Sequence, residues 1–461
     1  MTKSAQPLVI QSNVSAPKPM AVDGDGIYIT LEDPITKERT TLIDGSTGAA
    51  VGAVGHKDPE IIEAMKHAAE TSVYNYPGAI SNYPSEELAE FLVQNSPKDA
   101  FAAVLITGSG SESVENALKL AKQYQDEIGQ TQRYKFVSRK KTYHGYTMGC
   151  LSMGHNPRRT RFDKFLGDPK TFLKTEAVYP YRDLKEGETL EQYKDRLVKD
   201  VEDTFIANDP STIVGWLGET VVGSTFGTCP PVPGYLEGVR EVCHKYGILF
   251  MLDEVMSGIG RCGTFHAWEQ YLPENQGPDI QTIGKTLGSG YVTIAAVLVS
   301  PKVKNALTDG SNYIIGAQTY HQHAFNCQVA LAVQKKVKRD NLIANMKEQG
   351  NYLGAQLKEK LLGKSKIVGD VRGSGGFWSL ELVKDTKTKE PFAADLKMHG
   401  VVGKQISKNG ATSMPCPGTV DNKIGDHVLF APSFIITREQ TDKLIDIVVK
   451  SVFEVEEQIG A

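Results

Sequence analysis

The sequence of 461 residues lacks any apolar stretch long enough to cross a lipid bilayer. Its longest apolar runs, such as IAAVLVS at 294–300, are far shorter than the roughly 20 residues that a membrane-spanning helix needs. The beginning of the chain also lacks the charged start and long apolar segment of a secretory signal. We therefore expect a soluble protein of the cytoplasm that has no membrane partner.

Basic residues are not in excess, and the cysteines do not occur in pairs. The chain has 51 Lys and Arg against 55 Asp and Glu, a net charge of −4, and no long basic run, so it lacks the electrostatic signature of a nucleic-acid-binding protein. Its six cysteines show no CxxC spacing, so we expect neither a zinc site nor a disulfide framework, but buried small hydrophobic residues in a reducing compartment. The partner is expected to be a small molecule.

Short β-rich runs alternate with longer helical patterns through the middle of the chain. The run AAVLIT at 102–107 precedes a segment at 111–127 in which apolar residues recur at helical spacing. Further strands are expected at 134–139, 214–219 and 248–254. Strands that alternate with helices predict an α/β fold with a large, mostly parallel sheet covered on both faces.

The last third of the chain has a different pattern. Long amphipathic helices are expected at 325–362 and 438–457, and a glycine-rich turn leads into a strand at 371–383. This favours a second, smaller α+β domain, which the strands expected at 25–33 and 40–48 would join. The expected divisions are a mobile N-terminal lead (1–24), the N-terminal part of the small domain (25–70), the large domain (71–325) and the C-terminal part of the small domain (326–461).

A glycine-serine turn, TGSGSES at 107–113, lies directly between an expected strand and an expected helix. Ligands bind at the carboxyl ends of parallel strands, and free amides at a helix N-terminus suit a phosphate, which Gly110 and Ser111 would approach. The alternative is a capped helix start with Ser109 or Ser111 as the N-cap. The stretch by itself does not separate the two.

In the run MLDEVMSGIGRCG at 251–263, Asp253 and Glu254 follow an apolar stretch, so at least one of these carboxylates is expected at the exit of a buried strand. A buried carboxylate needs a partner, because an isolated buried charge is costly. The glycines at 258, 260 and 263 match the dinucleotide pattern GxGxxG, but they do not directly follow the strand. A flexible loop is the simpler interpretation, and an NAD-dependent oxidoreductase is a less favoured alternative.

Lys285 lies among small residues in IGKTLGSG at 283–290. It does not fit the phosphate-loop pattern, because Asp279 stands where that pattern needs a glycine. Most lysines are solvated surface groups, but here the small neighbours leave room for a bulky partner. Tyr143 and His144 follow another expected strand, where an aromatic ring either stacks on a planar ligand or packs in the core.

One cofactor uses a phosphate nest, an aromatic platform, a strand-end carboxylate and a lysine at the same time. Pyridoxal 5′-phosphate needs its phosphate held, its ring stacked, its pyridine nitrogen kept protonated and its aldehyde tethered to an amine. The sequence therefore predicts pyridoxal phosphate as the cofactor, with Lys285 as its tether.

From about residue 25 to 450 the sequence resembles the class III aminotransferases, the fold-type-I pyridoxal-phosphate enzymes that include the ω-amino acid and amine transaminases. The resemblance rests on SGSESVENALKLAK, YHGYTMG, GETVVGS, LDEVMSGIGRCG, IGKTLGSG and GDHVLFAPSFIIT, in this order. It implies that Lys285 is the Schiff-base lysine and proton carrier, that Asp253 pairs with the pyridinium nitrogen, and that Glu219 supports the catalytic groups.

The same resemblance implies the remaining cofactor contacts. Val255 would pack on the ring face opposite Tyr143, with His144 beside it, and Gly110 and Ser111 would hold the phosphate. In this family a threonine of the neighbouring subunit completes the phosphate site. Thr319 stands in that place, so the resemblance implies a homodimer.

Fewer sequence features indicate the substrate. Met256 stands where many family members have glutamine, which favours the amine and ω-amino acid branch. Lys423 stands where a mobile arginine often occurs, and a lysine is a poorer clamp for a carboxylate, so an acidic amino acid is not expected as donor. Tyr76 and Tyr83 are candidate walls of an apolar pocket.

These features predict a transaminase that moves an amino group from an amine or ω-amino acid to a 2-keto acid such as pyruvate by a ping-pong mechanism. Decarboxylases, aminomutases and racemases of the same family remain alternatives, since the cofactor motifs do not separate them. No metal is expected, because His321 and His323 lack a third ligand nearby in sequence and fit a solvated or interface pair.

Overall fold

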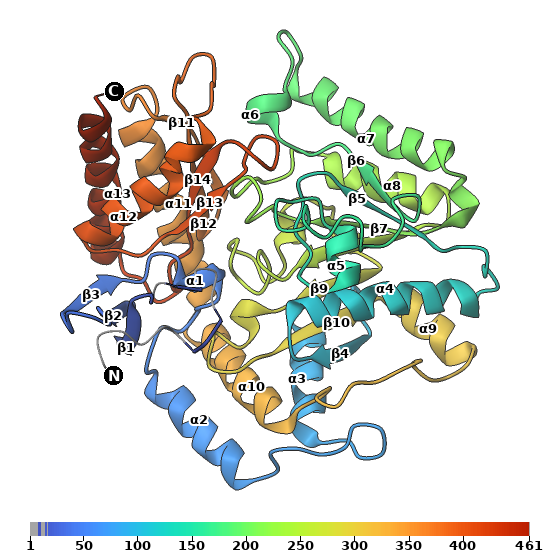
Figure 1. Ribbon diagram of the computed structural model, residues 1–461. Helices are drawn as coiled ribbons and strands as arrows, with labels where there is room; N and C mark the ends of the chain where they lie inside the picture. Colours follow the sequence, from blue (N-terminus) through green and yellow to red (C-terminus); the bar gives the residue numbers. More distant parts are fainter. Residues whose placement is uncertain (1–7, 11–13, 16, 461) are drawn as a thin grey trace.

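A seven-stranded sheet forms the centre of the larger lobe in the computed structural model, which describes residues 8–10, 14–15 and 17–460 (Figure 1). The strand order is β4-β10-β9-β8-β7-β5-β6, and only β10 runs antiparallel to its neighbours in this sheet. The strands are β4 (Ala103–Thr107), β5 (Lys135–Arg139), β6 (Phe172–Thr175), β7 (Ile213–Glu219), β8 (Leu249–Glu254), β9 (Ile280–Ile283) and β10 (Ala295–Val299).

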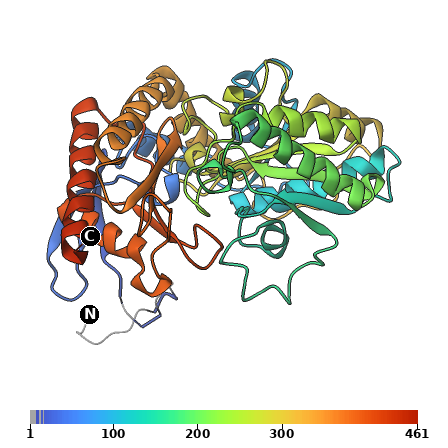
Figure 2. The ribbon, with the colours of Figure 1, turned by 90° about the horizontal axis from the view of Figure 1, so that it is seen from above.

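Helices cover both faces of this sheet (Figures 1 and 2). They are α3 (Tyr83–Gln94), α4 (Gly110–Glu127), α5 (Met148–Met153), α6 (Pro180–Asp183), α7 (Leu190–Ala207), α8 (Tyr235–Lys245), α9 (Pro301–Asp309) and α10 (Ala324–Arg339), with short 3₁₀ turns η1 (Pro210–Thr212), η2 (Ala267–Gln270) and η3 (Lys285–Leu287). Strand β8 is buried on both faces, because Phe250 and Leu252 pack in the core beneath α7 and α8, whereas Leu249 and Met251 pack in the core beneath α4 and α9. The alternation is the period-2 geometry of a strand.

The two ends of the chain build the smaller lobe together. Figures 1 and 2 show the N-terminal strands beside the C-terminal helices. Ile27 and Ile43 share one hydrophobic core with Leu444 and Val448. Its elements are β1 (Met20–Asp25), β2 (Tyr28–Glu32), β3 (Arg39–Ile43), α1 (Thr47–Ala50), α2 (Pro59–Glu70), α11 (Leu342–Leu361), β11 (Val368–Ser374), β12 (Phe377–Leu382), η4 (Ala394–Leu396), α12 (Met398–Asn409), β13 (Met414–Pro417), β14 (Asp426–Phe430) and α13 (Arg438–Ile459).

The predicted fold class is confirmed, including the smaller domain made from both chain ends. Two details differ from the expected elements. The helical pattern at 325–362 is two helices, because Asn341 between α10 and α11 adopts a left-handed backbone with φ 54°. The predicted N-terminal lead, 1–24, lies partly outside the described residues, and β1 occupies its last part. Within the described ranges, each helix is too short or too polar to span a membrane.

Candidate active site

The carboxyl ends of β7, β8 and β9 and the first turn of α4 open onto one cavity of about 310 Å³. This is the edge at which a mostly parallel sheet gathers its ligand-binding groups. The predicted residues that line this cavity are Gly110, Ser111, Tyr143, His144, Glu219, Asp253, Val255 and Lys285. Segments more than 170 residues apart in the sequence thus meet at one place, as the strand-end argument expects.

Asp253 is held by three hydrogen-bond donors at the end of β8. Its Oδ2 lies 2.8 Å from Nδ1 of His144, and its Oδ1 accepts hydrogen bonds from the Val255 N–H (3.0 Å) and the Thr282 hydroxyl (3.1 Å). Both Asp253 and His144 are buried, so this pairing supplies the partner that a buried carboxylate needs. The strand alternation places Asp253 on the same face as Leu249 and Met251, the face covered by α4.

Glu254, the next residue, belongs to the opposite face. Its carboxylate accepts hydrogen bonds from the N–H groups of Ala267 (2.8 Å) and Trp268 (2.7 Å) and from the Gln281 amide (3.1 Å). Burial raises the pKa of Glu254 to about 7. Two adjacent carboxylates therefore have different tasks, since Asp253 faces the cavity and Glu254 ties down the loop after β8.

Glu219 ends β7 beside this pair. Its carboxylate accepts hydrogen bonds from the N–H groups of Tyr143 (3.1 Å) and Gly223 (3.2 Å). Burial raises the pKa of Glu219, the nearby His144 opposes that change, and the neighbouring charge of Asp253 adds to it. Burial likewise raises the pKa of the Tyr143 phenol. Glu219 thus fixes the backbone of the segment that carries Tyr143.

The first turn of α4 is a capped helix start and also has the geometry of an anion site, the two interpretations that its sequence left open. Ser109 is the N-cap, and its hydroxyl accepts a hydrogen bond from the Glu112 N–H (3.3 Å). The amides of Gly110 and Ser111 still begin the helix at the cavity wall, where the helix dipole favours an anion. A Cβ at Gly110 would lie 2.6 Å from Cγ1 of Val255, so only glycine fits there. A cap and an anion site therefore coexist.

Lys285 begins the turn η3 directly after β9, with a left-handed backbone of φ 46° that is uncommon for a non-glycine residue. Burial lowers the pKa of its amine to about 8, although the carboxylates of Asp253 and Glu219 act to raise it. A lysine with this pKa is partly neutral near physiological pH, as a nucleophilic amine must be. Lys285 is half-buried and has no hydrogen-bond or ion-pair partner among the described residues.

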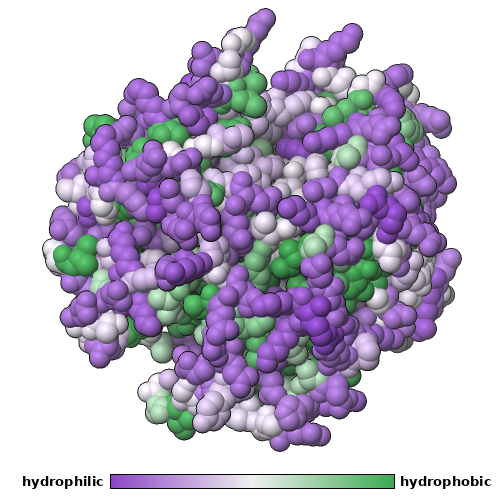
Figure 3. Space-filling view, turned by 180° about the vertical axis from the view of Figure 1, so that it is seen from behind, coloured by the Kyte–Doolittle hydropathy of each residue, from purple (hydrophilic) through white to green (hydrophobic). Residues whose placement is uncertain are grey.

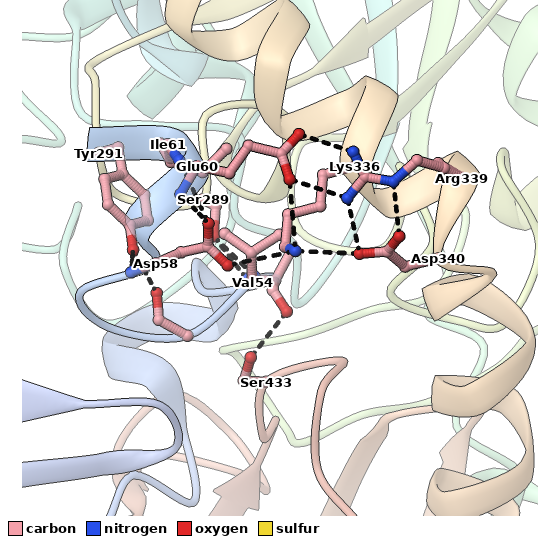
Figure 4. A network of polar contacts seen from close by, with 12 residues as sticks. Val54, Asp58, Glu60, Ile61, Ser289, Tyr291, Lys336, Arg339, Asp340 and Ser433 are labelled. Atoms are coloured by element: carbon pink, nitrogen blue, oxygen red, sulfur yellow. Dashed lines mark hydrogen bonds and ion pairs between the residues drawn. The ribbon is translucent and has the colours of Figure 1, made fainter. Parts of the chain in front are cut away.

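The segment that follows Lys285 is fastened to the N-terminal part of the chain (Figure 4). The Ser289 hydroxyl accepts hydrogen bonds from the N–H groups of Ala53 (2.8 Å) and Val54 (3.1 Å). The Tyr291 hydroxyl accepts a hydrogen bond from the Asp58 N–H (2.8 Å). The lysine is therefore carried on a turn whose far side cannot move without the small lobe.

A network of charged side chains continues this attachment to α10 (Figure 4). Lys336 on α10 lies 3.4 Å from Asp58, 3.7 Å from Glu60 and 2.9 Å from Asp340. Arg339 adds a paired contact to the Glu60 carboxylate (2.8 Å for each nitrogen). The start of α2 is thereby held against α10.

These residues fit pyridoxal phosphate. Asp253 offers a buried, hydrogen-bonded carboxylate for a pyridine nitrogen, and the first turn of α4 offers free amides to a phosphate at a position where a Cβ would be excluded. Tyr143 and Val255 form two walls, and Lys285 supplies an amine of lowered pKa. Each of the four requirements of the cofactor meets a separate group of one cavity.

Several residues of the cavity wall are not predicted from the sequence. Arg158 comes from the loop after α5, and Ser224 from the loop after β7. Ala49 comes from the N-terminal segment and Met414 from β13. Ser224 belongs to GETVVGS, so that motif was a possible signal. No spacing in the sequence connects the other three with the strand ends.

The four remaining predicted residues do not line this cavity. Tyr76 and Tyr83 are 63% and 84% exposed, and Thr319 is exposed as well. Lys423 is exposed in the loop between β13 and β14. Within one chain, Tyr76 and Tyr83 are therefore not walls of this cavity, and Lys423 does not reach it, because the side chains of all three are exposed.

The structure bears on two further expectations. The segment that contains Gly258, Gly260 and Gly263 is a series of turns, as the favoured loop interpretation expects, and no α-helix directly follows it to receive the phosphates of a dinucleotide. His321 is buried rather than solvated, and its Nε2 lies 3.1 Å from the Glu112 carboxylate. His323 is the N-cap of α10, so the two histidines are not a solvated pair, and the alternative of an interface pair stays a prediction.

Comparison with known proteins gives a consistent result. Residues 11–452 match the model of the class-III aminotransferase family. An uncharacterized aminotransferase of Schizosaccharomyces pombe is 41% identical over 435 residues, which cover 94% of this chain and 92% of that protein. The chloroplastic gamma aminobutyrate transaminase 3 of Solanum lycopersicum is 31% identical over 411 residues, which cover 87% of this chain and 75% of that protein.

A solved structure agrees in fold over almost the whole chain. The crystal structure of the omega transaminase from Pseudomonas jessenii in complex with PMP aligns with a TM-score of 0.87 and 27% identity. The alignment covers 96% of this chain and 94% of that chain.

Proposed function

Since the chain belongs to the class-III aminotransferases, which depend on pyridoxal phosphate, we propose that it transfers an amino group from an amine or ω-amino acid to a 2-keto acid such as pyruvate by a ping-pong mechanism. The observation that carries the proposal is the meeting of the Lys285 amine and the Asp253 carboxylate in one cavity. An omega transaminase is among the structures with the same fold, which supports the donor class.

The roles of the residues follow from their positions. When bound, pyridoxal phosphate carries the amino group and withdraws electrons from the carbon that loses a proton. Asp253 keeps a proton on the ring nitrogen, and Nζ of Lys285 takes and returns the proton of the substrate carbon. Tyr143 and Val255 would hold the ring, and the α4 N-terminus would bind the phosphate. Glu219 positions Tyr143 through its backbone.

The proposed donor class rests on the wall of the cavity. Val221, Met256, Met414 and Ala49 give it an apolar section. An alkyl or aryl group is stabilised there by leaving water, whereas a charged group would lose hydration without a fixed partner. This supports a donor whose amine is attached to an apolar body.

We propose a homodimer in which Thr319 completes the phosphate site of the partner subunit. Two segments, 73–83 and 313–320, carry several exposed apolar side chains each and touch each other through Tyr74 and Tyr320 (ring centroids 6.0 Å apart). Hydrophobic side chains also reach the surface on the face shown in Figure 3. Apolar surface of this extent is typical of a protein interface, and Thr319 lies within it.

All six cysteines are free and buried, which fits a reducing compartment and supports a cytoplasmic location. The central test of the function is the absorption spectrum of the purified protein before and after addition of an amine such as 1-phenylethylamine. We expect the band of the bound cofactor to be lost with the amine and to return with pyruvate, as alanine is formed.

The Lys285→Ala variant should bind the cofactor without either change, whereas Lys304→Ala, which alters an exposed lysine of the same lobe, should behave as the natural protein does. Product analysis completes the test. Release of CO₂, or an isomer of the donor in place of a carbonyl product, would show a decarboxylase, aminomutase or racemase and would overturn the proposal.

A further inference from the structure

Among the described residues that line the cavity, Arg158 is the one guanidinium. It lies in the loop between α5 and β6, and its side chain is exposed, so it stands at the open rim. The guanidinium lies over the ring of Tyr143, with its central carbon 4.8 Å from the ring centroid. Its Nη1 is 3.4 Å from the Ser224 hydroxyl. Two wall residues thus hold this cation in a defined orientation.

Arg158 has no carboxylate within ion-pair distance in the part of the chain that the structure describes. Both carboxylates of the cavity have other partners, since Asp253 is paired with His144 and Glu219 accepts two backbone N–H groups. The adjacent Arg159 differs, because it is bound to Asp163 (2.8 Å) and to the Gly154 carbonyl (2.7 Å). Of the two neighbouring arginines, only Arg158 keeps its charge available to a ligand.

Two anions enter the proposed reaction, the phosphate of the cofactor and the carboxylate of the keto acid. The phosphate already has the N-terminus of α4, with the amides of Gly110 and Ser111. The carboxylate has no cation other than Arg158 and Lys285 on the described wall, and Lys285 is needed for proton transfer. Lys423, which stands in the sequence where related enzymes often have a mobile arginine, is not on the wall. A planar guanidinium matches a carboxylate with two parallel hydrogen bonds.

We propose that Arg158 binds the carboxylate of the 2-keto acid acceptor, and of the amino acid formed from it, and thereby sets the preference of the second half-reaction for an acid. This rests on the proposed function, because it requires a keto acid to enter the cavity that Lys285 serves. An uncharged donor makes no use of the guanidinium, which then remains against Tyr143 and Ser224. One cavity in this way accepts an apolar amine and an acid in turn.

The test compares Arg158→Gln with the matched control Arg159→Gln, since both remove one arginine from the same loop. With saturating amine, kcat/KM is measured for pyruvate and for propanal, an acceptor that lacks the carboxylate. We expect the pyruvate-to-propanal ratio to fall about tenfold in Arg158→Gln, the effect of one charge-assisted contact at an exposed site, and to stay unchanged in Arg159→Gln. Arg158→Lys should recover only part of the ratio.

Binding is also measured without turnover. In calorimetric titration of the holoenzyme, the unreactive carboxylate propionate should bind about tenfold more weakly to Arg158→Gln, while the Kd of the apoprotein for pyridoxal phosphate stays unchanged. An unchanged ratio, an equal loss for both acceptors, or weaker cofactor binding without a change in the ratio would overturn the proposal, and the last result would assign Arg158 to the phosphate.

Failure of the proposed function gives a different pattern. The natural protein would then show no amine-dependent change in its spectrum and no turnover with either acceptor, and the propionate titration would still report whether Arg158 binds a carboxylate.

Discussion

The cofactor side of the cavity and its open rim are built in different ways. On the cofactor side, Asp253 and Glu219 stand at strand ends, are buried, and have backbone or side-chain donors on their carboxylates. At the rim, Arg158 is exposed, and its side chain contacts the Tyr143 ring and the Ser224 hydroxyl instead of a carboxylate. The sheet fixes the groups that must be placed accurately for the chemistry, whereas the loops can change which substrate is admitted without disturbing the sheet.

Replacing Asp253 gives the largest effect expected on the cofactor side. Asp253→Asn keeps the size of the side chain but removes the charge that we propose to hold a proton on the ring nitrogen, so kcat should fall by about 10³-fold, as for other preorganised electrostatic groups. Steady-state rates and urea unfolding measure activity and stability separately.

The matched control is Glu254→Gln, one residue further on the opposite face. Loss of an acceptor for buried N–H groups should lower the free energy of unfolding by about 1–3 kcal/mol and leave kcat within a few-fold. Equal loss of activity in both variants would contradict the division of tasks between the two faces of β8.

A mixed dimer of two variants tests whether each active site needs a residue from the second subunit. The Lys285→Ala and Thr319→Ala variants are each expected to have low activity. The less affected of the two should still lose about 10²-fold or more in kcat. Co-expressed as a mixed dimer, they should regain activity at one site, because that site receives Lys285 from one chain and Thr319 from the other. If Thr319 acts within its own chain, the mixed dimer has no intact site and remains as defective as its parents.

The pH dependence of cofactor uptake gives a smaller effect. Because burial lowers the pKa of Lys285 to about 8, its neutral fraction rises about tenfold from pH 7 to pH 9 and changes little above that. The rate at which the apoprotein takes up pyridoxal phosphate should follow this fraction, measured by stopped-flow absorbance. A lysine with an ordinary pKa would give a rate that continues to rise towards pH 10.5.

The sign of the carboxylate effect can be checked in the same experiment. Asp253 acts to raise the pKa of Lys285, so Asp253→Asn should move the plateau to lower pH. A shift to higher pH would mean that the two groups do not interact as their positions indicate.

Sequence patterns predicted, for a physical reason, which residues come together in one cavity. The end of a buried strand is visible as an apolar run, and the parallel arrangement then brings such ends together, so Asp253, Lys285 and the α4 turn could be placed without a structure. The break at Asn341 was not visible, because both helices around it share the same apolar period.

The rim was not predictable in this way. The Arg158 guanidinium contacts Tyr143 and Ser224, which belong to other segments of the chain, and neither contact has a local sequence signature. The family resemblance predicts Tyr76 and Tyr83 on the wall of the pocket, yet within one chain both side chains are exposed. The spacing of apolar residues indicates which face of a helix or strand is buried, but it does not indicate the path of a loop.

The core shared by the two chain ends also sets an order of events during synthesis. The Thr412 hydroxyl donates a hydrogen bond to Asp44 (2.8 Å) across 368 residues of sequence, and β3 is further paired with the backbone of Gly410 and Thr412. At about 5–20 residues per second, the first strands wait roughly 20–70 s for these partners to leave the ribosome. During that time the large lobe can fold, while Ile27 and Ile43 lack the C-terminal side chains that cover them in the complete core, and a chaperone is suited to shield them. The strands that emerge first are therefore the last to be completed.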